Sequence, residues 1–195
     1  MTRQLRGLIV DAASELSLEI GWSAVTMVRL AARVGVSRQT IYNEVGSKAQ
    51  LAQLVVEAAN GRLLALLSQV VAPLPGTAST DVRDGFRRLI GAIAADRQLT
   101  ALAAGLHGVE SGALPLADSE NHELLAELAE GLARSLGGVE LDLTAAERSM
   151  VSSALVRLVL CTVVQPGGPG GGSADELAWV AARLLRSAED IQLMG

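Results

Sequence analysis

Polar side chains suited to nucleic-acid contacts are concentrated between positions 26 and 48 of this chain. Arg38 and Gln39 are adjacent, and such side chains match the major-groove edges of guanine and adenine through paired hydrogen bonds. Thr40 suits a thymine methyl group or a phosphate oxygen. The other candidates suit phosphate contacts, through side-chain donors or through the free backbone N–H groups at a helix start: Thr26, Ser37, Tyr42, Asn43 and Lys48. The segment therefore predicts contacts to both bases and phosphates.

The same positions have simpler structural interpretations. Ser37 and Thr26 each precede a predicted helix and equally serve as N-caps, a role that is compatible with a phosphate contact. Lys48 is the only lysine in the sequence, which favours a specific contact over an incidental surface charge.

Two short helices joined by a tight turn are predicted to carry these side chains. Thr26 begins the first, which runs to Val34, and the second runs from Ser37 to about Asn43. Gly35 lies where the first helix must end, and glycine tolerates the positive φ of such a turn. The spacing is typical of a helix-turn-helix, whose second helix lies in the major groove.

This segment resembles the N-terminal signature of tetracycline-repressor-type (TetR) regulators. The matching residues are Gly21-Trp22, Val25-Thr26, Leu30-Ala31, Val34-Gly35-Val36-Ser37, Thr40-Ile41-Tyr42, Ser47-Lys48 and Leu51, within a stretch from about Leu8 to Leu54. The resemblance implies phosphate contacts by Tyr42 and Lys48, a homodimer, and a small-molecule effector that releases the DNA. Family members usually carry phenylalanine at the positions of Ser17 and Val45, so the smaller residues here predict a less stable head.

Composition and charge agree with an all-α chain that directs one end toward DNA. Half of the residues are hydrophobic but only 2% are aromatic, so the core must consist of aliphatic side chains and alanine, which favour helix. Residues 1–50 carry six basic and four acidic groups, a net of +2, and the remaining 145 residues carry ten and seventeen, a net of −7. The basic end is expected to face phosphates, although charge alone leaves an incidental difference open.

Periodicity and capping signals predict about nine helices in two domains. The first helix spans about Arg3 to Ile20, and the fourth runs from Ser47, in a capping box with Gln50, to about Val71. Five more are expected over residues 81–95, 97–109, 118–136, 144–165 and 174–193, with two further capping boxes beside the glycine-rich linker 166–172. We expect a three-helix DNA-binding domain over residues 1–46 and a helical effector-binding and dimerisation domain over residues 47–195.

The last two helices are the predicted dimerisation surface. Trp179 points about 200° away from the apolar stripe that contains Leu177, so it needs a second buried surface unless it is simply exposed. A homodimer supplies that surface when two helices from each subunit form a four-helix bundle. The predicted interface residues are Val156, Leu160, Trp179 and Arg183.

The middle helices exceed what dimerisation requires and are expected to bind a small hydrophobic effector. Only Phe86 and Trp179 are aromatic beyond the head, so a cavity lined by aliphatic residues would favour an acyl chain over a flat aromatic molecule. The alternative is a solid core. Arg157, within an apolar helix, is expected to pair with an internal or a ligand carboxylate. The candidate ligand contacts are Leu102, Leu106, His107, Leu128, Leu155 and Arg157.

Other functional classes find little support. The chain shows no catalytic triad pattern, no His-Glu-x-x-His motif and only one cysteine, Cys161, so neither an enzyme nor a bound metal or cofactor is expected. Its longest apolar run is too short to span a bilayer, and no N-terminal leader is apparent, which predicts a cytoplasmic protein and no membrane partner. The prediction is a homodimeric repressor of a palindromic double-stranded operator. The alternatives are a ligand-independent DNA-binding protein and a helical protein-interaction module.

Overall fold

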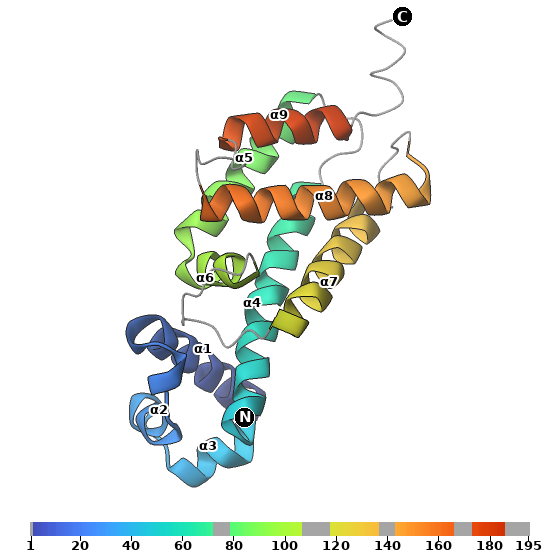
Figure 1. Ribbon diagram of the computed structural model, residues 1–195. Coiled ribbons are helices and arrows are strands. Elements are labelled where there is room, and N and C mark those ends of the chain that lie inside the picture. Colours follow the sequence, from blue (N-terminus) through green and yellow to red (C-terminus); the bar gives the residue numbers. More distant parts are fainter. Residues whose placement is uncertain (1, 72–78, 107–117, 137–142, 166–172, 186–195) are drawn as a thin grey trace, which may run out of the picture.

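Nine α-helices and one 3₁₀ turn form the part of the chain that the computed structural model describes: residues 2–71, 79–106, 118–136, 143–165 and 173–185 (Figure 1). The head contains α1 (Thr2–Ile20), η1 (Trp22–Ala24), α2 (Met27–Val34) and α3 (Arg38–Val45). The body contains α4 (Lys48–Val71), α5 (Ser79–Ala95), α6 (Arg97–Leu106), α7 (Asp118–Leu136), α8 (Ala145–Val164) and α9 (Ala174–Leu184). The predicted all-α class is confirmed.

Side-chain caps and glycines define the helix-turn-helix as predicted. Thr26 Oγ1 accepts a hydrogen bond from the backbone N–H of Arg29 at 3.3 Å, and Ser37 Oγ accepts from that of Thr40 at 3.1 Å. Gly35 ends α2 in the left-handed region, with φ of 77°. The η1 turn was not predicted, and α3 ends at Val45, two residues beyond its predicted end at Asn43.

A small aliphatic core holds the three head helices together. Ile9 of α1, Leu30 of α2 and Ile41 of α3 are fully buried in it. Ser17 and Val45, the two positions that carry phenylalanine in the family resemblance, are also buried. Both therefore occupy interior positions of the head, as predicted.

Helix α4 belongs to the head and to the body. It begins with the predicted capping box, in which Ser47 and Gln50 exchange hydrogen bonds of 2.8 and 3.2 Å between side chains and backbone. Its first turns add Leu51 and Val55 to the head core, and its later turns add Leu63 and Leu67 to the body core. By length and composition it could cross a membrane, but in this fold it is the central packed helix. The domain boundary between residues 46 and 47 stays a prediction.

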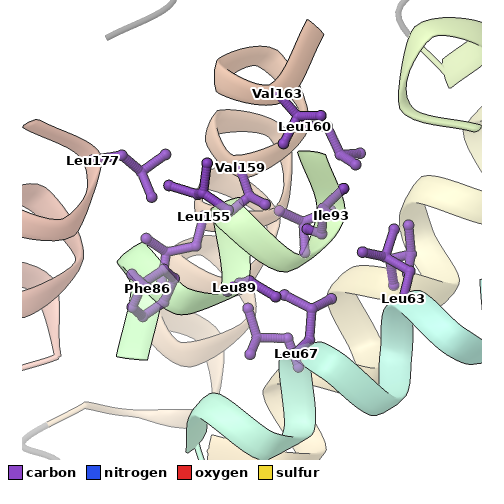
Figure 2. Close-up of a cluster of buried hydrophobic side chains, with 14 of the residues drawn as sticks. Leu63, Leu67, Phe86, Leu89, Ile93, Leu155, Val159, Leu160, Val163 and Leu177 are labelled. Carbon is purple, nitrogen blue, oxygen red and sulfur yellow. The ribbon is translucent and has the colours of Figure 1, made fainter. Parts of the chain in front are cut away.

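The body core is an aliphatic cluster with one aromatic ring (Figure 2). Phe86 of α5 lies in it with Leu155 of α8 and Leu177 of α9. Helix α4 runs parallel to α7, because Asn60 bonds to Glu127 and Ser68 to Ser135 at the same sequence separation of 67 residues. These two pairs fix the register of α4 against α7.

The capping boxes of α8 and α9 are also confirmed. Thr144 pairs with Glu147, and Ser173 pairs with Glu176. The hydrogen bonds that Thr144 donates to Glu147 lower the pKa of that carboxyl. The predicted ends of the sixth and ninth helices, at residues 109 and 193, and the linker 166–172 lie outside the described residues.

Candidate nucleic-acid interface

The exposed face of α3 carries the predicted base-reading side chains. Arg38 and Gln39 are exposed in its first turn, and Tyr42 and Asn43 are exposed one turn later. Ile41 is fully buried against the other head helices, which fixes the rotation of α3 about its axis. Thr40 is half-buried, and its hydroxyl is hydrogen-bonded to that of Ser37 at 2.8 Å. The helix therefore presents one continuous polar face at the end of the molecule remote from α9 (Figure 1).

The ammonium group of Lys48, at the start of α4, is held by the η1 turn. Lys48 Nζ donates to the backbone carbonyl of Ser23 at 3.1 Å and lies 5.5 Å from the centroid of the Trp22 ring. A cation over an indole face is electrostatically favourable, and the contact limits the freedom of a long side chain. Trp22 and Ser23 are positioning residues that sequence reasoning did not identify, because η1 itself was not predicted.

Arginine contacts fix α2 against its neighbours. Arg29 Nη1 donates to the carbonyl of Ala24 at 2.8 Å. Arg33 binds Glu19 of α1 through both terminal nitrogens, at 2.6 and 3.1 Å, and lies 3.6 Å from Glu15. Its hydrogen bond lowers the pKa of Glu19, and the same bond raises the pKa of Arg33. These two arginines are thus engaged within the head.

The predicted DNA-contacting residues occupy three adjacent elements. Thr26 caps α2, Lys48 begins α4, and the others belong to α3 or its cap. Helices α2 and α3 pack together, and α3 also contacts α4, so the three helix ends belong to one unit. The structure brings the set together, while the contact of each residue with DNA stays a prediction.

The predicted effector contacts are divided between the core and the surface. Leu102, Leu128 and Leu155 are fully buried in the body core. His107 and the Leu106 side chain lie outside the part of the chain that the structure describes. Arg157 is exposed on α8, so the expectation that it lies buried was wrong. Its position two residues after Leu155 turns it to the opposite side of the helix.

The predicted dimer residues are divided in the same way. Trp179 and Arg183 are exposed on α9, on the side that the sequence analysis expected. Val156 and Leu160 are instead 2% and 1% exposed in the core of the chain itself. Helix α8 is apolar on nearly all sides, so its sequence alone did not distinguish the inner face from the outer one.

A buried amide in α4 was missed by sequence reasoning. Asn60 is 4% exposed, and its Nδ2 donates to Glu127 of α7 at 2.7 Å. Its Oδ1 accepts no hydrogen bond within the described part of the chain. A buried carbonyl oxygen without a donor is costly, so this atom is suited to receive a hydrogen bond from a bound molecule.

A charged cleft separates the head from the body. It has a volume of about 540 Å³ and lies where α1 faces the junction of α5 and α6. Glu15 and Glu19 line it from the head, and Arg62 and Arg97 line it from the body. Arg62 also pairs with Asp96 at 3.9 Å. Opposite charges thus face each other across the joint between the two halves of the molecule.

Two family models match most of the chain. Residues 9–55 match the model described as bacterial regulatory proteins, tetR family, and residues 77–183 match that of the bacterial tetracyclin repressor C-terminal domain. The chain is 30% identical over 181 residues to the HTH-type transcriptional regulator AlkX of Mycobacterium tuberculosis, covering 89% of this chain and 82% of that protein.

Two solved structures share the fold. The TetR family repressor AlkX from Dietzia sp. strain DQ12-45-1b, described as implicated in biodegradation of n-alkanes, superposes with a TM-score of 0.65 at 24% identity. That alignment covers 92% of this chain and 94% of the Dietzia protein. The Streptomyces coelicolor protein SCO7518 superposes with a TM-score of 0.68 at 17% identity, covering 94% and 99% of the two chains.

Proposed function

Because the chain belongs to the TetR family of bacterial transcriptional regulators, a non-enzymatic family, we propose that it is a ligand-released repressor that binds a palindromic operator as a homodimer. The observation that carries this proposal is the exposed polar face of α3, supported by Lys48 at the start of α4, which the η1 turn holds. Base-reading and phosphate-binding groups are thus presented together on a rigid support. A protein that meets chromosomal DNA in this way works in the cytoplasm.

Substitution of Lys48 tests the division between phosphate and base contacts. We expect Lys48→Ala to weaken binding to operator and random DNA alike and to reduce the salt slope of log K by about one for each bound head. Arg38→Ala, in the same domain, is expected to cost about 1 to 3 kcal/mol on the operator and much less on random DNA. Fluorescence anisotropy over a range of salt concentrations measures both effects. An unchanged slope for Lys48→Ala would contradict the phosphate contact.

Exposed apolar side chains on α8 and α9 support the homodimer. Met150 and Leu158 project from α8, and Trp179 and Leu184 project from α9. Large apolar groups gathered on two neighbouring helices are typical of an interface with another chain. The two helices lie at the end of the molecule remote from α3 (Figure 1), so pairing through them leaves both heads available for DNA. A pair of heads about 34 Å apart would contact successive major grooves.

The effector that we propose is an aliphatic molecule bound in the body. The side chains around Leu102, Leu128 and Leu155 are aliphatic, with Phe86 as the one aromatic ring of the cluster. The Dietzia relative is implicated in n-alkane biodegradation, and its fold is shared. Asn60 Oδ1 offers an acceptor for a hydroxyl proton on such a molecule. Since the three leucines are fully buried, binding must displace neighbouring side chains.

The cleft between head and body supplies a route from the effector to the head. Helix α6 contacts α1, α4, α7 and α8, so a ligand that moves α6 also moves Arg97 relative to Glu19. The charge of Arg97 contributes to lowering the pKa of Glu19, and Glu19 in turn holds Arg33 of α2. Effector binding is therefore expected to change the orientation of the head and the spacing of the two heads.

Dodecanoic acid and biphenyl, which has the same number of carbon atoms, are suitable probes of the effector class. We expect dodecanoic acid at about 100 times its Kd to stabilise the protein by about 2.7 kcal/mol and to release a fluorescent operator duplex. Biphenyl is expected to do neither, because the core offers one aromatic ring for stacking. Differential scanning calorimetry and anisotropy measure the two effects. A larger response to biphenyl would contradict an aliphatic site.

A further inference from the structure

A hydrogen bond within α3 bears on which base pair the helix reads. Gln39 Nε2 donates to Asn43 Oδ1 at 2.9 Å, one helical turn later, and both side chains are exposed. We propose that Asn43 is a positioning residue that holds the Gln39 amide for adenine, so that each operator half-site carries an A·T pair opposite Gln39. This inference rests on the proposed function. It also replaces the phosphate contact that the sequence analysis predicted for Asn43.

The hydrogen-bonding inventory of the pair favours adenine. A glutamine amide has one acceptor oxygen and two N–H donors. With one N–H of Gln39 given to Asn43, the Oε1 atom and one N–H remain. Adenine presents an acceptor, N7, beside a donor, the N6 amino group, and so complements these two groups. Guanine presents two acceptors there and would place O6 against the oxygen of Gln39.

The bond to Asn43 also restrains the Gln39 side chain in the unbound protein. A free glutamine side chain must lose the freedom of three rotatable bonds when it binds a base. A side chain that is already held in the unbound protein loses less, which increases the preference for the matching base.

The neighbouring contacts leave this pair undisturbed. The hydroxyls of Ser37 and Thr40 are bonded to each other at 2.8 Å rather than to the Gln39 amide. Tyr42 is exposed and Lys48 is bonded to Ser23, so the Gln39–Asn43 bond engages neither of these two phosphate candidates. Positioning of Gln39 by Asn43 is therefore separable from the phosphate contacts of the same surface.

Selection from a randomised DNA library tests the inference with the full-length protein. The wild type and the variants Gln39→Ala, Asn43→Ala and Asn43→Asp are each used to enrich DNA, and the bound sequences are determined. We expect the wild type to enrich a palindrome with an adenine preferred about tenfold at one position of each half-site, and Gln39→Ala to lose that preference. Asn43→Ala is expected to reduce it about threefold while the other positions are unchanged.

Asn43→Asp separates positioning from phosphate binding. It keeps an acceptor for Gln39 Nε2, so we expect it to retain the adenine preference although its charge weakens binding to every sequence. A phosphate role predicts instead that both Asn43 variants weaken all sequences with the adenine preference intact, and that result would overturn the inference. Loss of adenine preference in Asn43→Asp equal to that in Asn43→Ala would overturn it too. Enrichment of no palindrome by the wild type would instead reject the proposed function, and the inference with it.

Discussion

Trp179→Glu is expected to convert the protein from a dimer to a monomer and to weaken operator binding by about a hundredfold or more. The indole is 54% exposed in the single chain, on the outer side of α9. A buried interface tryptophan commonly contributes about 2 kcal/mol or more, and two-fold symmetry buries two copies. Two glutamates at that position would also be desolvated without a partner. Loss of the second head then removes the gain in effective concentration that a bivalent contact provides.

A matched control distinguishes loss of the interface from a general effect of added charge. Leu8 on α1 is 55% exposed, so Leu8→Glu places the same charge on an equally exposed apolar position. This position lies in the first helix of the head, whereas α9 is the last helix of the body. Analytical ultracentrifugation should show Leu8→Glu as a dimer and Trp179→Glu as a monomer at the same concentration. An intact Trp179→Glu dimer would place the interface elsewhere. Circular dichroism of both variants is expected to match the wild type, because neither side chain belongs to the core.

The head could be predicted from sequence because its signals are local. Thr26, Ser37 and Gly35 act within one helical turn of their own position, and each has the predicted conformation or hydrogen bond. The η1 turn escaped prediction because its three residues carry no periodicity. The hydrogen bond from Lys48 to Ser23 of this turn joins residues 25 positions apart. It could therefore be found only in the folded head.

The body was less predictable because its helices are apolar on more than one side. Leu155, Val156, Val159 and Leu160 all face inward on α8, while Arg157 and Leu158 between them face outward. Helical spacing alone leaves the rotation of such a helix undetermined, and the packing of α7 and α9 decides it. The burial of Asn60 likewise depends on its hydrogen bond to Glu127 of α7, and no local sequence pattern predicts that contact.

Helix α9, which carries the proposed dimer surface, packs on the body core, and Phe86 is part of that core. Phe86 of α5 is almost fully buried, and α5 and α9 are in close contact along their length. Figure 2 places its ring in one cluster with Leu155 and Leu177, so three helices meet around it. The largest fully buried side chain is thus located beneath the helix that carries the proposed dimer surface.

Phe86→Ala is expected to lower the free energy of unfolding by about 3 to 5 kcal/mol, because it removes a buried ring and leaves a cavity that the neighbours only partly fill. Phe86→Leu, which retains most of the volume, is the control and should cost much less. Urea unfolding measures both values, followed by tryptophan fluorescence and by circular dichroism. Because α9 rests on this ring, Phe86→Ala should also shift the dimer toward monomer at concentrations where the protein is still folded. A cost equal to that of Phe86→Leu, with dimerisation unchanged, would show that α9 is held independently of Phe86.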